Sequence, residues 1–314
     1  MHKKALASAL FLFSGVTRGQ PVPFLPDGTF DNLVAGTAPD CGIPAGSWHF
    51  PPSLPNCEPY PGAYSIVSTG DFDPSRSGRS LHVAIANRLE SEGYHLANVL
   101  SSPITPTSGE TIRCTWEVFV RQGQSGNQPL GVYIGADMGG GGHSTEFDRA
   151  TQMAWWGDGR LTVRTPTGPL TVVGAYPRDA WQSVRVDIHL GTQTWDFSWA
   201  PSGQPLQLLA SNLTFCSTAF PFTAIDRWSV AHWDENGTFI SDCYIDNVTM
   251  GLLCYANCDG STAAPILNIN DFFCFLNTFA AGSSNANCDA STVVPILNVN
   301  DFTCFLNRFA AGCL

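Results

Sequence analysis

The sequence predicts a mainly β protein: a jelly-roll β-sandwich followed by a small, all-α, EF-hand-like helical pair. Two observations carry this prediction. Residues 21 to about 250 contain short runs of alternating apolar and polar residues, separated by Gly, Pro, Asn and Asp, which is typical of strands joined by turns. The last sixty or so residues carry two copies of a helical pattern instead. We therefore divide the chain into a sandwich domain, 21–250, and a duplicated module, 251–314.

Six segments of the sandwich region show the alternation expected of strands. Regularly spaced short strands with turn residues between them favour a sandwich or jelly roll. The Pro- and Gly-rich first ninety residues are expected to form loops and edge strands. The six segments are 113–120, 131–134, 160–164, 170–173, 183–189 and 194–199.

Residues 1–20 have the pattern of an export signal. Lys3 and Lys4 form a short basic segment, and the apolar run over 5–13 that follows is too short to span a bilayer. The alternative is a buried N-terminal helix, but basic and then apolar residues at the extreme terminus favour export. No later segment reaches transmembrane length, so we expect a secreted protein, extracellular or attached to the cell surface.

The 314 residues carry a formal net charge of −11. An acidic protein repels phosphate backbones, which argues against nucleic acid as a partner. Polyanionic polysaccharides are disfavoured for the same reason, whereas cations and neutral glycans are compatible with this charge.

The strongest signal in the chain is an internal duplication with a period of thirty residues. Residues 257–282 read NCDGSTAAPILNINDFFCFLNTFAAG, and residues 287–312 read NCDASTVVPILNVNDFTCFLNRFAAG. Twenty of these 26 positions are identical. The two copies are therefore expected to form the same local structure.

Each copy predicts one short helix. An asparagine N-cap is followed three residues later by an aspartate, as in a capping box: Asn268 with Asp271, and Asn298 with Asp301. Phe and Leu at i, i+3, i+4 and i+7 then form one apolar face, and a glycine ends each helix. Because helices of this length are not stable alone, we expect the two copies to pack face to face.

A polar loop with hard oxygen donors precedes each helix. Ca²⁺ takes six to eight oxygen ligands, and an EF-hand loop supplies them at fixed offsets. The offsets match only in part, because an insertion ending in Pro-Ile-Leu separates the donors and Tyr255 replaces the first acid of repeat one. The candidate calcium ligands are Asn257, Asp259, Asn268 and Asp271, and then Asn285, Asn287, Asp289, Asn298 and Asp301. The alternative is a helical hairpin held by disulfides without metal.

The duplicated segment resembles a type I dockerin, and more closely the GC-type variant common in planctomycete secreted proteins. The paired NCD-S-T and LN-x-ND-F-x-C-F-LN motifs, the FAAG ends and Gly312-Cys313 carry the resemblance over 251–314. The family implies one calcium ion per repeat and a docking role, with a cohesin-like or cell-envelope partner. Tyr255 and the stretched loop should weaken calcium binding, most in the first repeat.

Eleven cysteines fit an oxidising compartment. A pair within each repeat survives duplication unchanged, which favours Cys258 with Cys274 and Cys288 with Cys304. The remaining predicted pairs are Cys254 with Cys313, Cys41 with Cys57, and Cys216 with Cys243. Cys114 is then left over, as a small apolar residue in a strand.

The end of the sandwich region has a second resemblance. The strands predicted over 181–189 and 194–199, the segment 243–250, and Phe30-Asp31-Asn32-Leu33 near the start look like concanavalin-like or laminin-G-like jelly rolls. In several carbohydrate-binding members, an N-terminal acid and the aspartate of the last strand share a structural calcium. Asp31 and Asp246 are the matching positions, and the alternative is that they cap a turn and a strand end.

We find no convincing catalytic constellation. Glu146 and Asp148 are the nearest to a glycanase pair, but they follow a run of glycines that gives no rigid support. The tryptophans are more suggestive, because exposed aromatics stack on sugar rings. A candidate glycan site near the 157–159 turn comprises Trp155, Trp156, Asp158 and Arg160; the alternative for each tryptophan is core packing.

These observations predict a secreted, surface-attached binding protein that recognises a carbohydrate and docks through its C-terminal module. A glycoside hydrolase or polysaccharide lyase on the same scaffold, and a structural or adhesive surface protein, are the alternatives. Paired acids in a long groove would favour the enzyme, and exposed tryptophans without acids would favour binding.

Overall fold

The computed structural model of the chain forms two compact units, one within Pro21–Leu253 and one within Cys254–Leu314. Residues 1–20, Cys41, Cys57, Asn285 and Cys313 lie outside the described residues, and so do the predictions made for them. The structure describes residues 30–31, 48–49, 64–86, 94–106, 110–121, 129–136, 149–166, 169–217, 221–232, 240–259, 265, 267–283, 286–289, 291 and 293–312.

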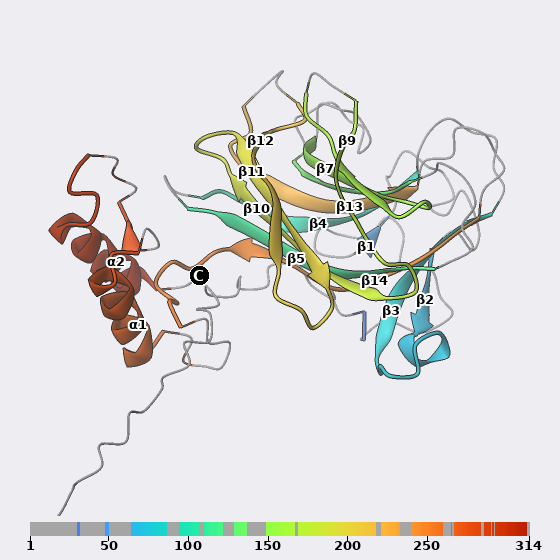
Figure 1. The fold of residues 1–314 in the computed structure, drawn as a ribbon, viewed down its shortest axis with the longest axis horizontal. Helices are drawn as coiled ribbons and strands as arrows, with labels where there is room; N and C mark the ends of the chain where they lie inside the picture. Colours follow the sequence, from blue (N-terminus) through green and yellow to red (C-terminus); the bar gives the residue numbers. More distant parts are fainter. Residues whose placement is uncertain are drawn as a thin grey trace, which may run out of the picture. The chain divides into compact units, whose positions relative to one another are not determined.

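The first unit consists of two seven-stranded antiparallel sheets packed face to face (Figure 1). Sheet A has the order β1 (Trp48–His49), β4 (Tyr94–Ile104), β13 (Ile225–His232), β6 (Pro129–Gly135), β7 (Arg149–Trp156), β8 (Arg160–Val163) and β9 (Thr171–Ala175). Sheet B has the order β12 (Gln207–Thr214), β11 (Thr194–Pro201), β10 (Trp181–His189), β5 (Ile112–Val120), β14 (Ile240–Leu252), β3 (Arg79–Ala86) and β2 (Tyr64–Ser68). This architecture confirms the predicted jelly-roll β-sandwich.

The core lies between the two sheets and is built by the alternation of side chains along each strand. In β10, Val184, Val186 and Ile188 point inward, and in β5 the inward residues include Cys114 and Trp116. Four tryptophans are almost fully buried in this core, two from each sheet: Trp155, Trp228, Trp116 and Trp195. The inward-facing, buried Cys114 confirms the prediction of a small apolar residue in a strand.

One polar side chain, Gln182, is built into this core. It is fully buried, and its Oε1 accepts hydrogen bonds from the indole Nε1 of Trp155 at 3.1 Å and of Trp199 at 2.8 Å. Its Nε2 donates to the carbonyl of Pro177 at 3.4 Å. The satisfied amide therefore ties an inward-facing tryptophan of sheet A to one of sheet B.

The second unit contains the two predicted helices, α1 (Ile269–Ala280) and α2 (Val299–Ala311). Both begin with the predicted capping box, on Asn268 and on Asn298. The helices pack through equivalent residues of the two repeats. Phe275 stacks on Phe305 with ring centroids 4.2 Å apart, so each copy completes the core of the other.

The cysteine predictions are confirmed for two pairs and wrong for one. Disulfides join Cys258 to Cys274 and Cys288 to Cys304. Cys254 is also disulfide-bonded. The predicted pair of Cys216 and Cys243 does not form, because Cys216 lies beyond the end of β12, beside β7 of sheet A, whereas Cys243 lies on β14 of sheet B. The amide of Cys216 bonds to Ala150 on β7 of sheet A, while Cys243 is a buried free thiol on β14 of sheet B.

No helix among the described residues is both long enough and apolar enough to cross a membrane.

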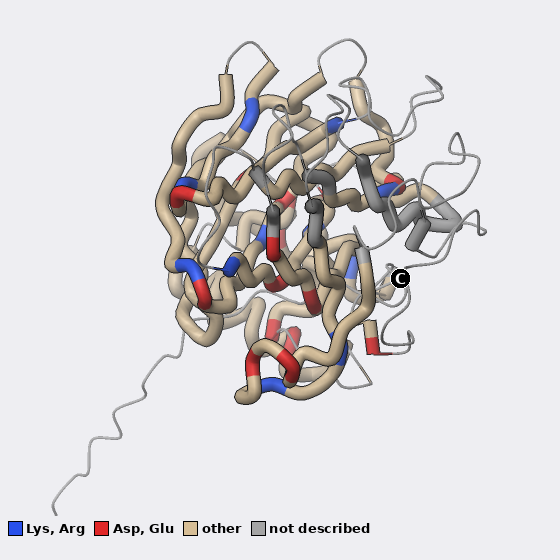
Figure 2. The backbone as a smooth tube through the Cα atoms, turned by 90° about the vertical axis from the view of Figure 1, so that its right-hand side faces the viewer, with Lys and Arg blue, Asp and Glu red and all other residues tan. Residues whose placement is uncertain are grey.

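Charged residues of the described strands are scattered over both sheets, and in several places an arginine adjoins an acid along the chain (Figure 2).

Candidate functional site

The outer face of sheet A, turned away from the core, carries a group of buried polar side chains. The strand register places them in two neighbouring rows across β13, β6 and β7. One row reads Arg227, Gly135 and Arg149, and the next reads Ser229, Tyr133 and Gln152. All five side chains are less than a tenth exposed. We call Tyr133, Arg149, Gln152, Arg227 and Ser229 the polar face of sheet A.

Glycine gives Tyr133 its position on this face. A Cβ atom added to Gly131 would lie 2.6 Å from the Tyr133 hydroxyl, so the phenol ring lies over the bare backbone of its own strand. The guanidinium of Arg149 lies over this ring, 4.3 Å from its centroid. The ring is therefore sandwiched between the sheet and a cation, a geometry that a side chain at Gly131 would prevent.

Gln152 uses only one of its two polar groups among the described residues. Its Oε1 accepts from Nη1 of Arg149 at 3.4 Å, while its Nε2 has no hydrogen-bond partner among the described residues. The side chain is fully buried. Leaving a buried donor unmet costs about 1–3 kcal/mol, so such a group is expected where a ligand completes the site.

The predicted glycan site is wrong for Trp155. This residue points inward on β7, is 1% exposed and donates to Gln182 in the core. Successive residues of a strand face opposite sides of the sheet, so the position of Trp155 near the turn does not determine which side its side chain faces.

The structure does bring the other three predicted residues together. Arg160 lies over the indole of Trp156, with Cζ 4.7 Å from the ring, and pairs with Asp158 at 2.6 Å. The indole Nε1 of Trp156 donates to Thr162 at 2.8 Å. Arg160 therefore already covers one face of the ring that a sugar would stack on.

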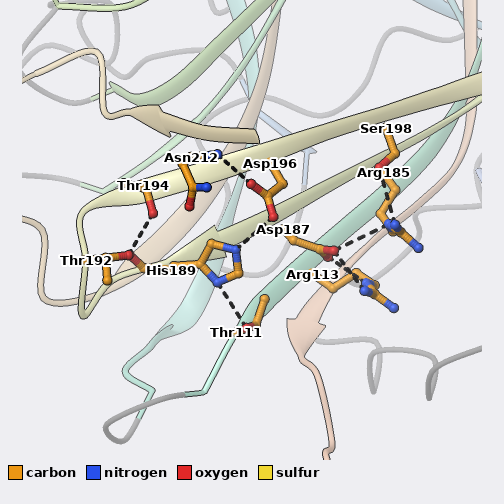
Figure 3. Close-up of polar contacts among 10 residues, drawn as sticks. All are labelled: Thr111, Arg113, Arg185, Asp187, His189, Thr192, Thr194, Asp196, Ser198 and Asn212. Carbon is orange, nitrogen blue, oxygen red and sulfur yellow. Dashed lines mark hydrogen bonds and ion pairs between the residues drawn. The ribbon is translucent and has the colours of Figure 1, made fainter. Parts of the chain in front are cut away.

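The outer face of sheet B, in contrast, satisfies its own charges (Figure 3). Arg113 makes a buried two-point ion pair with Asp187, at 2.6 and 2.8 Å. On the neighbouring strand β11, Asp196 accepts from His189 Nε2 at 3.3 Å and from the amide of Asn212 at 2.8 Å. These contacts are typical of a structural network.

Farther along sheet B, Glu117 anchors the connection between β2 and β3. Arg76 donates to both its carboxylate oxygens, at 2.6 and 3.1 Å, and Ser202 and Asn247 each donate at 2.8 Å. Burial alone would raise the pKa of Glu117, but these hydrogen bonds hold the pKa below its usual value. Because both of its carboxylate oxygens accept hydrogen bonds, Glu117 fixes the position of the connection between β2 and β3.

Asp246 lies on β14, opposite Glu117, and its pKa is shifted in the opposite direction. Burial raises the pKa of Asp246 to about 7, and the negative charges of Glu117 and Asp31 contribute. Its Oδ1 accepts from the amide of Asn247 at 2.7 Å. The carboxylate of Asp31 accepts from the amide of Arg79 at 2.8 Å. The fold thus brings the two predicted acids within electrostatic range of each other.

The shifted pKa of Asp246 predicts a pH dependence of stability. The folded pKa, about 7, lies above the unfolded value of about 3.9, so the fold favours the protonated form. Without divalent cations, this contribution is fully present below pH 4 and is lost as the pH rises to about 7. Denaturant unfolding of the wild type and of Asp246→Asn checks it. Their difference in free energy of unfolding should change across this range, and parallel curves would contradict the assignment.

In the C-terminal module, each helix-capping aspartate faces the loop before it. Asp271 accepts amides of Asn268 at 2.8 Å and of Asp259 at 3.1 Å, and Asp301 makes the equivalent contacts with Asn298 and Asp289, at 2.8 and 3.3 Å. Burial raises the pKa of Asp271, and the adjacent carboxyl of Asp259 raises it further. Each repeat therefore holds two carboxyl groups close together.

The loop of the second repeat gathers further oxygens. Oδ1 of Asn287 and Oδ1 of Asp289 both accept from the single amide of Ser291, at 3.0 and 2.9 Å, so these two oxygens lie close to each other. The predicted ligand Asn298, like Asn268, uses its side-chain oxygen as the helix N-cap. Asn257 is buried, and Tyr255 packs near Phe275 and Phe305 in the module core, where it supplies no carboxylate.

Among the residues that the structure describes, three or more His, Cys, Asp or Glu side chains are nowhere grouped as a metal site would group them. A cation in the second repeat would therefore rest on Asp289 and Asp301 together with amide and backbone oxygens, which is compatible with the ligand preferences of Ca²⁺.

The topology and register define the first unit as a jelly-roll domain. Charged side chains on the outer face of sheet B pair with one another, whereas on the outer face of sheet A a buried donor of Gln152 has no acceptor among the described residues. No protein-family model matches the chain, and no curated protein matches it. Similar solved structures include the catalytic domain of a glycoside hydrolase family 131 protein from Coprinopsis cinerea, at 13% identity over 73% of this chain and 93% of that chain, with a TM-score of 0.47. Lectin II from Ulex europaeus has 8% identity over 55% and 87%, with a TM-score of 0.35. An alginate lyase of polysaccharide lyase family 7 has 9% identity over 65% and 94%, with a TM-score of 0.42.

Sequence reasoning missed the polar face of sheet A. Its members come from β6, β7 and β13, and only the register brings them together. The available signal was the pair of glycines, Gly131 and Gly135, inside a strand pattern, where an isolated glycine indicates a close approach.

Proposed function

We propose that the chain is an exported carbohydrate-binding protein that binds a glycan on the polar face of sheet A. The observation that supports this most is the fully buried donor of Gln152 beside Tyr133 and Arg149, which has no acceptor among the described residues. Sugar recognition uses a few fixed polar groups beside aromatic surface. On the outer face of sheet B, the charged side chains drawn in Figure 3 pair with one another.

Two buried glutamines allow a matched test of this proposal. Gln152→Met should abolish glycan binding and change the free energy of unfolding little, because the loss of the long 3.4 Å hydrogen bond from Arg149 is offset by removal of a buried donor that has no acceptor among the described residues. Gln182→Met should lower the free energy of unfolding by about 2 kcal/mol, because it leaves two buried indole N–H groups without their acceptor.

A glycan array of the full chain identifies the binding, and denaturant unfolding measures stability. If Gln152→Met destabilises the protein as much as Gln182→Met and keeps full glycan binding, Gln152 is structural and the proposed site is wrong.

For the C-terminal unit, we propose a dockerin-like module that binds Ca²⁺ and attaches the sandwich to a cohesin-like or cell-envelope partner. The repeated carboxyl pairs and the converging oxygens of Asn287 and Asp289 support it. We also propose Ca²⁺ between Asp31 and Asp246, where a cation would relieve the repulsion between the two carboxylates.

Calcium should stabilise the full chain, by about 2.7 kcal/mol at a free concentration one hundred times the dissociation constant. Asp271→Asn and Asp301→Asn each remove the same capping carboxylate charge from one repeat. Because Tyr255 replaces an acid in the first repeat, Asp301→Asn should reduce the calcium-dependent stabilisation more than Asp271→Asn does. Calorimetric unfolding with calcium and with chelator measures this, and identical curves for the wild type would remove calcium from the proposal.

A further inference from the structure

We infer that the glycan bound on the polar face of sheet A is a linear, neutral chain of about three or more sugar units, which extends from Gln152 to Trp156 and displaces Arg160 from the indole ring. This inference rests on the proposed function, since it names the class of glycan bound at the same face. It joins the buried donor and the half-buried aromatic ring into one extended site.

The first argument is the direction of the side chains along β7. Met153 and Trp155 point into the core between the sheets. Successive residues of a strand face opposite sides, so Gln152, Ala154 and Trp156 share the outer face. Ala154, whose side chain is a single methyl group, is the residue of β7 that separates the other two on this face. The donor and the ring are therefore four residues apart, or about 13 Å along the strand.

This spacing sets the length of the ligand. A single pyranose ring is much shorter than the spacing of about 13 Å, so one sugar unit cannot contact both residues. Nε2 of Gln152 has no acceptor among the described residues, and a sugar oxygen at one end of the chain would supply it. The apolar face of a sugar unit at the other end would stack on the indole of Trp156.

The second argument is the rigid support of Trp156. Its carbonyl oxygen accepts hydrogen bonds from the hydroxyl of Tyr176 at 2.5 Å and from the amide of Gly159 at 2.9 Å. Its indole Nε1 donates to Thr162 at 2.8 Å, so the ring extends from β7 towards β8. Both ends of the residue are therefore fixed, as a platform for a ligand requires.

The third argument is that the cover over this ring is held weakly by comparison. Cζ of Arg160 lies 4.7 Å from the ring centre, yet this side chain is 41% exposed, and its partner Asp158 is 44% exposed. Exposed ion pairs contribute little to stability, and exposed cation–π contacts contribute modestly. A sugar ring can therefore replace the guanidinium on the indole, while Arg160 keeps its pair with Asp158.

Charge favours a neutral chain. At the Trp156 end of the site, the charges of Arg160 and Asp158 balance each other. At the other end, the Gln152 amide is uncharged and needs only an oxygen acceptor. A long polyanion would in addition be repelled by the net charge of −11.

Ladders of linear neutral oligosaccharides test the length. Chains of glucose, of mannose, of xylose and of galactose, from the disaccharide to the pentasaccharide, are titrated calorimetrically into the full chain. For at least one ladder, we expect the affinity to rise about tenfold between the disaccharide and the tetrasaccharide, because only the longer chains reach Trp156. Further units should change the affinity little.

Two variants test the role of the ring and of its cover. Trp156→Ala should remove the gain with length and leave binding of the disaccharide unchanged. Arg160→Ala should act in the opposite direction and strengthen binding of the longer chains about threefold, because stacking no longer displaces a cation. Arg160 is exposed, so this variant carries the test should Trp156→Ala fail to fold. Arg121→Ala is the matched control, since Arg121 is 47% exposed and pairs with Asp242 in sheet B, and it should change neither.

A disaccharide that binds as tightly as the longer chains, or an Arg160→Ala variant that does not strengthen their binding, would overturn the inference and leave glycan binding intact. If no member of the ladders binds, the inference fails, and the glycan array decides separately whether the proposed function fails with it.

Discussion

Replacing Asp187 by alanine is expected to lower the free energy of unfolding of the sandwich by about 3–5 kcal/mol. Asp187 accepts two hydrogen bonds from Arg113, whose side chain is 4% exposed, and Arg185 approaches the same carboxylate at 3.4 Å. Removing the acid leaves a buried guanidinium without its partner. Denaturant unfolding of the full chain measures the loss.

Two further variants separate this effect from a general loss of charge. Replacing both Arg113 and Asp187 by leucine should cost much less than Asp187→Ala, because the buried guanidinium is removed with its acid and only the partly exposed Arg185 loses this carboxylate. Asp196 lies directly opposite Asp187, but its contact with His189 is more exposed, so Asp196→Ala should cost less than about 1 kcal/mol. Equal losses for Asp187→Ala and Asp196→Ala would contradict the difference that we assign to burial.

Replacing Cys258 and Cys274 together by serine should destabilise the C-terminal unit by about 3 kcal/mol, because the disulfide closes a loop of 16 residues in the unfolded chain. A unit of this size buries a small core, so a loss of this size should be visible as partial unfolding. Amide hydrogen exchange of α1 and α2 in the full chain reports on this unit separately from the sandwich.

The second repeat supplies the matched control. Cys288 and Cys304 have the same sequence separation, so their double serine variant should have a similar effect. Cys243→Ser changes a cysteine that forms no disulfide and should leave exchange in the helices unchanged. Unchanged exchange in both double variants would mean that packing of the phenylalanines alone holds the unit.

The strands with clear alternation could be predicted from the sequence, and those buried on both faces could not. Alternation predicted strands within β5, β6, β8, β9, β10 and β11, and all six are present. In β7, seven of eight residues are buried, and a register shift opposite Ile134 and Gly135 breaks the period of two. β12 was missed for another reason, since it is exposed or half-buried throughout.

The predicted sites also divide into those that local sequence patterns could predict and those that depend on the whole fold. Local patterns predicted the capping boxes and the disulfides within each repeat, because their partners lie at most sixteen residues apart. The pair of Cys216 and Cys243 was wrong, because the strand that a loop residue such as Cys216 contacts depends on the whole topology. Tyr133 and Gln152 lie on consecutive strands, but Ser229 comes from β13, much later in the chain, and the register that joins the three is a property of the fold.

The stacking of Phe275 on Phe305 has a consequence for how this tail can vary. Each thirty-residue copy uses the other's aromatic ring as its own interior, so a single copy has no complete core. A chain that lost one copy would expose the ring of the other to water and would be open to proteolysis. The smallest unit that can be gained, lost or transferred to another protein is therefore the pair.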